Sequence, residues 1–240
     1  MSSVKIKELE KPKHNKVKML CDEILHDKLL KYPMIEDAFS TNSFNIVVGK
    51  PGQGKTSWVT NLVKHEFKKV FECIILIMPA SSRQSIDNDI FGKNLPEDQL
   101  YDDLTVEILD GIYEKLNENS KEGYNSLLII DDFQQRLKDP DISKALERVV
   151  IKTRHLRTTS FYLVQNYQKV PKSLREIAFN LVLFNIGKSS LLRVFDEVIQ
   201  MKKEKYEAII ELCFKEPHDW LLLNLHRSKS IYCNWDLVEF

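Results

Sequence analysis

The sequence predicts an α/β fold in which a mostly parallel central sheet is flanked by helices. Short apolar runs alternate along the chain with stretches of helical period, the pattern of strands joined by crossover helices. At 240 residues and 43% hydrophobic content, the chain is long enough to bury the core of one large domain. A glycine-rich loop, Gly49–Thr56, joins the first run to the first helical stretch. Together these observations favour one sheet covered by helices.

Short apolar runs mark the expected strands, and residues at helical spacing mark the expected helices. The strands are expected at residues 44–48, 73–78, 104–109, 126–131, 160–165 and 181–186. Helices are expected at about 59–70 and 142–150. Asp139-Pro140-Asp141 gives the second helix an acidic start with proline in its first turn, which suits the positive end of a helix dipole.

The chain divides into an arm and a domain. Residues 1–20 carry six lysines against two glutamates and show no apolar period, which predicts a basic, flexible N-terminal arm, either simply solvated or in non-specific contact with phosphates. Residues 21–240 are expected to form a single domain without internal repeats. Its last part is a helical stretch at 189–214 and then a C-terminal hairpin within 215–240.

Composition excludes several classes of protein. The 35 lysines and arginines balance 35 aspartates and glutamates, so a nucleic-acid contact must come from a local patch. The apolar runs are far shorter than the roughly 20 residues that span a bilayer, and the start of the chain lacks a secretory signal, so we expect a soluble protein made in the cytosol. Four cysteines without paired spacing are expected to be reduced thiols.

The glycine-rich loop fits the phosphate-binding pattern G-x-x-x-x-G-K-[ST] in its required strand-to-helix setting. Its glycines let backbone N–H groups approach phosphates at the positive end of the following helix. Lys55 is expected to reach the β- and γ-phosphates of ATP, and the Thr56 hydroxyl to bind Mg²⁺. The nucleotide-binding residues are therefore Gly49, Lys50, Pro51, Gly52, Gln53, Gly54, Lys55, Thr56 and Ser57. Ser57 stands where a dinucleotide fold has its third glycine, which disfavours that fold.

A second site motif is the apolar run 127–130, which ends in Asp131 and Asp132. Ligands bind at the carboxyl ends of parallel strands, so Asp131 is expected to hold Mg²⁺ through its water shell and Asp132 to orient or deprotonate the attacking water. We expect run 104–109 to supply a strand between the phosphate-loop strand and this acidic strand. That arrangement indicates a P-loop NTPase of the ASCE (RecA-like) branch.

Further candidates surround the run at 160–165. This strand is expected to lie beside the acidic strand and to bring Gln165 to the γ-phosphate, although strand ends are often simply polar. Arg154 and Arg157 end the preceding helix. They either complement its dipole or reach the γ-phosphate of a neighbouring subunit, which requires an oligomer.

Taken together, these motifs resemble the FtsK-HerA superfamily of P-loop ATPases, and more closely the poxvirus-type DNA packaging ATPases of nucleocytoplasmic large DNA viruses, over residues 24–226. The resemblance implies an enzyme that converts ATP and water to ADP and phosphate and translocates double-stranded DNA into a capsid. It assigns catalysis to Lys55, Asp132 and Gln165, with Arg154, Arg157 and then Arg175 as arginine candidates. Asp132 departs from the glutamate common in the wider superfamily, which implies slower turnover or a water-bridged arrangement.

The resemblance also implies partners and a location. These are sequence-independent double-stranded DNA, capsid or portal proteins, a homo-oligomeric ring of five or six subunits, and the host cytoplasm at viral assembly sites or the virion. Cationic patches for DNA are the N-terminal arm, residues 152–157, and the cluster Lys202, Lys203 and Lys205.

Two other functions share the phosphate loop. A small-molecule kinase would need an arginine-rich lid, and a nucleotide-bound scaffold for virion assembly would bind ATP without DNA-stimulated hydrolysis. A GTPase is disfavoured because the sequence has no N-K-x-D motif. Tyr32, Phe44 and Trp58 are more typical of core residues than of stacking partners for a base.

Overall fold

One ten-stranded sheet runs through the part of the chain that the computed structural model describes, namely residues 5–7, 39, 42–67, 70–84, 95–225 and 230–239. The strands are β1 (Lys5–Lys7), β2 (Phe44–Val48), β3 (Cys73–Ile77), β4 (Leu100–Tyr101), β5 (Ser126–Asp131), β6 (Thr158–Val164), β7 (Asn180–Phe184), β8 (Trp220–Asn224), β9 (Ile231–Cys233) and β10 (Asp236–Glu239). Their order across the sheet is β1-β10-β9-β8-β7-β2-β6-β5-β3-β4.

The sheet has a parallel part and an antiparallel part. From β7 through β2, β6, β5 and β3 to β4, every neighbouring pair is parallel. From β7 outward through β8, β9 and β10 to β1, every pair is antiparallel. In the region of the expected C-terminal hairpin, β8 and β9 pair antiparallel. Within the expected N-terminal arm, residues 5–7 form β1, and the rest of the arm lies outside the described residues.

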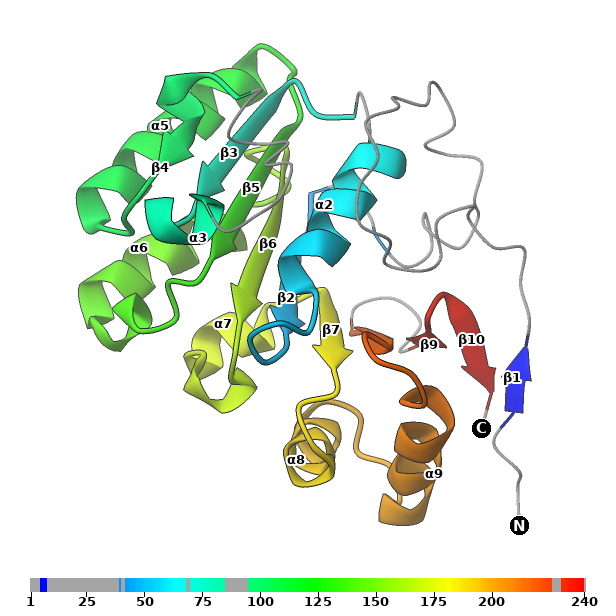
Figure 1. Cartoon of the computed structure of the whole chain (residues 1–240). Helices are drawn as coiled ribbons and strands as arrows, with labels where there is room; N and C mark the ends of the chain where they lie inside the picture. The colour runs from blue at the N-terminus through cyan, green and yellow to red at the C-terminus, as the bar shows by residue number, and fades with distance from the viewer. Residues whose placement is uncertain are drawn as a thin grey trace.

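Helices lie on both faces of the sheet (Figure 1). They are α2 (Lys55–His65), α3 (Ala80–Gln84), α5 (Val106–Lys121), α6 (Pro140–Ile151), α7 (Lys172–Glu176), α8 (Lys188–Val198) and α9 (Lys203–Cys213), with short 3-10 turns η1 (Glu97–Gln99), η2 (Arg136–Lys138) and η3 (Tyr167–Lys169). The acidic start predicted for α6 is confirmed, because Asp139 is its N-cap and accepts the N–H of Asp141, with Pro140 at the first helical position. Among the described residues, no helix has both the length and the apolar character needed to cross a membrane.

Alternating strand residues feed two separate apolar cores. On β5, Leu128 and Ile130 belong to the cluster formed with α5 to α9, whereas Leu127 and Ile129 belong to the cluster formed with α2. Successive side chains of a strand point to opposite faces, so a continuous apolar run is the expected sequence of a strand covered on both sides. This explains why β2, β5 and β7 are buried at every position.

An aromatic cluster anchors α2 to the antiparallel strands. The Trp58 ring lies 5.2 Å from the Trp220 ring and stacks on Trp235 at 6.1 Å between ring centroids. Trp58 and Phe44 are 3% and 1% exposed, so both are core residues. Burial of large rings in such pairs stabilises the packing beyond their area alone. The helix that follows the phosphate loop is therefore fixed against Trp220 of β8 and against Trp235.

The run at 104–109 is not a strand, contrary to expectation. Thr105 caps α5 by accepting the N–H of Ile108 at 3.3 Å, and Leu109, Ile112 and Leu116 recur at helical spacing with no exposed surface. The run is the first turn of an amphipathic helix. The strand inserted between the phosphate-loop strand β2 and the acidic strand β5 is β6.

The helical stretch expected at 189–214 is two helices, α8 and α9. Gln200, between them, has φ 55°, a left-handed conformation that an α-helix does not accommodate. The Tyr206 hydroxyl accepts the N–H of Met201 and so holds the connection against α9. The break lets Phe195 and Tyr206 stack with their rings 5.0 Å apart.

Glu66, which caps the end of α2, provides a test of this packing. Glu66 is 4% exposed, and burial raises the pKa of its carboxyl to about 7 from an ordinary 4.5. The folded protein therefore holds this proton more tightly than the unfolded chain does. The stabilisation from the protonated form is complete below about pH 4.5 and is lost as the pH rises through 7.

We predict that Glu66→Gln removes this loss. As the pH is raised from 4.5 to 8, the free energy of unfolding of the variant should rise relative to that of the natural chain by up to about 3 kcal/mol, because one pKa unit corresponds to about 1.4 kcal/mol. Urea denaturation at both pH values measures the difference. Glu118→Gln, at an exposed position on α5, is the control. Parallel pH profiles for Glu66→Gln and the natural chain would contradict the assignment.

Candidate functional site

The predicted site motifs meet where the central parallel strands of the sheet have their carboxyl ends. β2, β6 and β5 are adjacent and parallel, so the phosphate loop, Gln165 and the acidic pair all follow carboxyl ends of neighbouring strands. Open α/β sheets bind ligands at this edge. The prediction that the run at 160–165 lies beside the acidic strand is confirmed by the β5–β6 pairing.

The phosphate loop has the backbone that close phosphate contact requires. Gly52 and Gly54 have φ of 76° and 95°, which favour glycine, and α2 begins at Lys55 directly after Gly54. A Cβ added to Gly49 would meet Lys55 Cγ at 3.0 Å and Phe184 Cβ at 3.1 Å. The Gln53 carboxamide closes the loop, because its Oε1 accepts the Lys50 N–H at 2.6 Å. The first turn of α2 contains no acidic residue, so its positive end is available to an anion.

Thr56 and Asp131 meet beneath this loop. The Thr56 hydroxyl donates to Asp131 Oδ2 at 2.6 Å, across 75 positions of sequence. A hydroxyl and a carboxylate oxygen are hard donors that suit Mg²⁺, which usually takes one or two protein oxygens and completes its octahedron with waters and phosphate oxygens. The residues present therefore fit the predicted Mg²⁺ site.

Burial and charge act against each other in this cluster. Asp131 is 6% exposed, and burial raises the pKa of its carboxyl to about 6, opposed by the Thr56 hydrogen bond and the charge of Lys55. Burial also lowers the pKa of Lys55, opposed by the carboxylates of Asp131 and Asp132. Each charged group thus offsets the desolvation of its neighbour.

Asp132 is held by two side chains that follow different strands, Gln165 after β6 and Ser82 after β3. Its Oδ1 accepts the Gln165 Nε2–H at 3.1 Å, and its Oδ2 accepts the Ser82 hydroxyl at 3.1 Å. Asp132 has φ 65°, so the backbone turns directly after the buried Asp131 and leaves the second carboxylate exposed. The structure brings together the predicted pair Asp132 and Gln165. Ser82, on α3 after the end of β3, was missed, although the same rule of strand ends could have found it.

Gln134 is a second residue that the sequence did not predict. Its Oε1 accepts the backbone N–H groups of Gln165 at 3.2 Å and Asn166 at 3.1 Å, and its Nε2 donates to the Asn166 carbonyl. One side chain thus joins the loop after Asp132 to the loop that carries Gln165. No residue type or spacing in the sequence marks this role, because it depends on the β5–β6 pairing.

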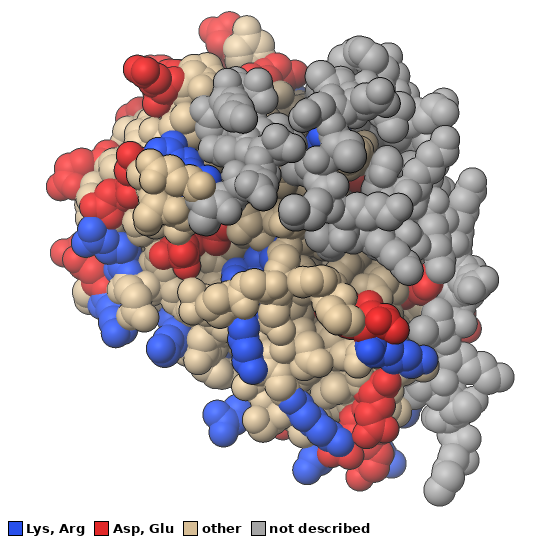
Figure 2. Space-filling model, viewed as in Figure 1, with Lys and Arg blue, Asp and Glu red and all other residues tan. Residues whose placement is uncertain are grey.

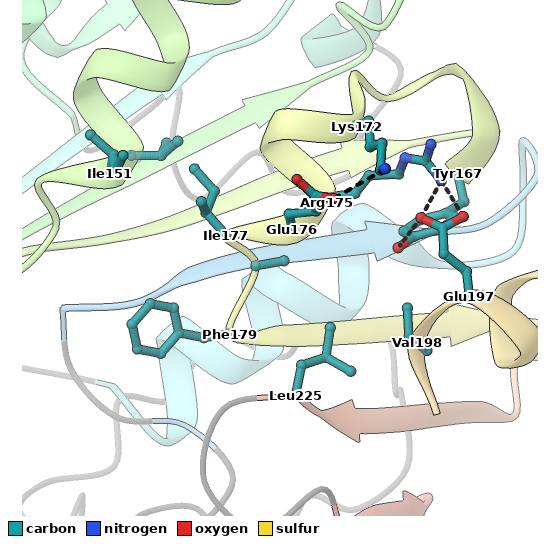
Figure 3. A pocket seen from close by; sticks show the side chains of 12 residues that line it. Ile151, Tyr167, Lys172, Arg175, Glu176, Ile177, Phe179, Glu197, Val198 and Leu225 are labelled. Carbon is teal, nitrogen blue, oxygen red and sulfur yellow. Dashed lines mark hydrogen bonds and ion pairs between the residues drawn. The ribbon is translucent and has the colours of Figure 1, made fainter. Parts of the chain in front are cut away.

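The arginine candidates are dispersed. Arg154 and Arg157 lie in the turn before β6, at the opposite edge of the sheet from Gln165. The seven residues of β6 separate the two edges by about 20 Å, so neither arginine reaches the phosphate loop of its own chain. Arg175, on α7, lies after β6. Its guanidinium pairs with Glu197 and lies 5.0 Å from the centre of the Tyr167 ring (Figure 3).

We predict that Gln134→Ala slows turnover of ATP without weakening its binding. Loss of three hydrogen bonds frees the loop that carries Gln165, and misplacing one positioning group costs about tenfold or more in rate. We expect kcat to fall about tenfold while KM changes less than twofold. Gln135→Ala is the matched control, because Gln135 is exposed and its side chain does not cap η2. Equal kcat values for the two variants would contradict this role.

Solved structures of viral ATPases share this fold. The DNA-packaging ATPase B204 of Sulfolobus turreted icosahedral virus superposes with a TM-score of 0.58 at 18% identity, over 81% of this chain and 98% of that chain. The genome packaging NTPase B204 of Sulfolobus turreted icosahedral virus 2 has TM-scores of 0.54 with ATP-gammaS and 0.57 with AMPPCP, both at 19% identity. Each match covers 80% of this chain, and 95% and 96% of the respective B204 chains. At these identities the likeness shows the fold.

Comparison of sequences gives the family. No curated protein matches the chain. The family model for the poxvirus A32 protein matches residues 34–219, a span that includes the phosphate loop, the acidic pair and Gln165. This confirms the resemblance to a poxvirus-type family, and the chain belongs to the poxvirus A32 protein family.

Proposed function

We propose that this protein is an ATP-hydrolysing motor that moves double-stranded DNA into a viral capsid. The observation that carries the proposal is the convergence of two contacts at one sheet edge, Thr56 with Asp131 and Asp132 with Gln165, beside a phosphate loop. Hydrolysis needs both a phosphate and metal site and a group that activates water. Family membership and the likeness to viral packaging ATPases support packaging as the purpose.

In this mechanism the loop and the acidic pair have separate tasks. Lys55 and the backbone N–H groups at the start of α2 hold the β- and γ-phosphates. Asp132 takes a proton from water as the water oxygen bonds to the γ-phosphorus. The bond from that phosphorus to the bridging oxygen breaks, which leaves ADP and phosphate. Gln165, linked to Asp132 at 3.1 Å, orients the water.

A bound Mg²⁺ would supply charge neutralisation to the phosphate oxygens at Thr56 and Asp131. The 2.6 Å contact between these side chains supports a cation shared by both. Because Asp131 is buried, a cation there would also favour its charged form. The proposed metal ligands are therefore Thr56 and Asp131.

The proposal includes a ring, DNA and capsid partners. On the face drawn in Figure 2, lysine and arginine side chains of the described residues are interspersed with aspartate and glutamate. A motor of this kind would grip DNA through small patches repeated around a ring, because phosphate contacts add across subunits. We assign Lys202, Lys203 and Lys205 at the start of α9 to such a patch. The proposed place of action is the host cytoplasm at viral assembly sites.

We predict that double-stranded DNA raises steady-state ATP hydrolysis. We also predict that Lys55→Ala lowers hydrolysis at least a hundredfold, because the variant loses the ammonium group that holds the phosphates. Phosphate release with and without DNA measures both effects. Lys144→Ala is the matched control, since Lys144 is 78% exposed on α6 and faces Asp141 rather than the phosphate loop.

The same assay separates the alternatives. ATP binding without DNA-stimulated turnover would contradict the motor and support a nucleotide-bound scaffold. Transfer of phosphate to a small acceptor in place of water would support a kinase.

We further predict that Arg154 acts across a subunit interface, with Arg157 as the second candidate. Arg154→Ala subunits would retain an intact phosphate loop, and Lys55→Ala subunits would retain the arginine. Rings of either variant alone should be inactive. Mixed rings should recover hydrolysis, because some intact phosphate loops then face the intact Arg154 of a neighbouring subunit. Activity is measured across mixing ratios. Full activity of Arg154→Ala alone, or no recovery on mixing, would contradict the assignment, and Arg157→Ala is then tested in the same way.

A further inference from the structure

A pocket of about 560 Å³ lies beside the phosphate loop on the side of β7. Three segments line it: the loop itself at Lys50, Gly52 and Gln53, the residues that follow β7, and residues 214–219 between α9 and β8. The volume falls within the range of small-molecule sites, about 300 to 1,000 Å³. It is distinct from the cluster of Asp131, Asp132 and Gln165, which lies on the other side of β2.

The strand order fixes which end of a nucleotide reaches this pocket. A terminal phosphate must face Asp132 and Gln165, which follow β5 and β6 on one side of β2. The other end of the triphosphate chain therefore leads to the opposite side, where β7 pairs with β2. The pocket after β7 is where the nucleoside of a bound nucleotide has room.

The walls of the pocket are tied to the phosphate loop through Gln53. Its Nε2 donates to the Asn185 carbonyl at 2.5 Å, and its own carbonyl oxygen lies 3.0 Å from His218 Nδ1. Asp219 braces residues 214–219, because its Oδ2 accepts the N–H groups of Lys215 at 3.0 Å and Glu216 at 2.7 Å. The pocket and the phosphate loop therefore form one connected unit.

The hydrogen bond of His218 determines its tautomer. A carbonyl oxygen only accepts, so Nδ1 carries the proton in the contact with Gln53, and a neutral ring keeps an acceptor at Nε2. His218 also has φ 69°, a left-handed backbone that is uncommon for residues other than glycine. The ring is thus held at the pocket with its acceptor on the side away from Gln53.

We propose that this pocket binds the nucleoside of ATP and that His218 Nε2 accepts a hydrogen from the exocyclic amino group of adenine. Adenine has a donor at that position and guanine a carbonyl acceptor, so His218 selects adenine. Phe44 and Trp58 are buried in the core and are not available to the base. The inference rests on the proposed ATP-hydrolysing function and identifies how that site recognises its nucleotide.

The test compares ATP with purine riboside triphosphate, which lacks only the 6-amino group, in the full chain at pH 8. We expect the natural protein to favour ATP about tenfold in kcat/KM, the size of one hydrogen bond of about 1.4 kcal/mol. His218→Ala should reduce that preference to less than twofold, mainly through KM. His218→Gly should also reduce the preference to less than twofold, and glycine tolerates the positive φ at this position.

Glu114→Ala, at an exposed position on α5 that does not line the pocket, is the control and should keep the preference. The affinity for ADP, measured by calorimetry, should fall in both His218 variants and stay unchanged in Glu114→Ala. An equal preference in the natural protein and both His218 variants would overturn the inference. If Lys55→Ala still abolishes hydrolysis, that failure concerns the pocket alone, whereas hydrolysis that survives Lys55→Ala removes the proposed function itself.

Discussion

The parallel register of β2, β6 and β5 is the constraint on which the site depends. Val48 pairs with Val164, and Asp131 pairs with Leu163, so the three strands end within one residue of each other. The N–H of Gly49 donates to the Val164 carbonyl at 3.0 Å and extends the ladder into the phosphate loop. A slip of one residue would turn Asp131 to the other face of the sheet, because side chains alternate along a strand. Backbone pairing thus aligns three segments that are distant in sequence.

Two adjacent carboxylates acquire different properties from their surroundings. Asp131 ends a strand buried at every position and contacts Thr56, whereas Asp132 follows in a left-handed conformation and is exposed. Desolvation favours the neutral form of the first, and the charge of Lys55 opposes this effect. The second keeps access to water while Gln165 and Ser82 fix its direction. A single peptide unit therefore separates a group suited to a cation from one suited to water.

Local sequence predicted those parts of the molecule that depend on local physics. Runs buried on both faces marked β2, β5 and β7, and the loop pattern marked Lys55 and Thr56. The run at 104–109 was mistaken for a strand because six apolar-rich residues are too few to distinguish a buried strand from the first turn of α5. Gln134 and His218 could not be predicted, since each acts through pairing or loop contacts between distant segments, whereas the rule of strand ends could have found Ser82. The sequence also indicated the family correctly, because the order of its motifs is more specific than any one of them.

The sheet ends in very short strands on both sides, three residues in β1 and two in β4. Long, exposed edges invite other chains to add strands, and short edges discourage such additions. Over the part of the chain that the structure describes, the two edge strands therefore offer little backbone to which another copy could add a strand. Contacts between copies would have to form through side chains and loops. Such contacts can be made and broken without opening a ladder of backbone hydrogen bonds, which is what the proposed ring of subunits would need during a cycle.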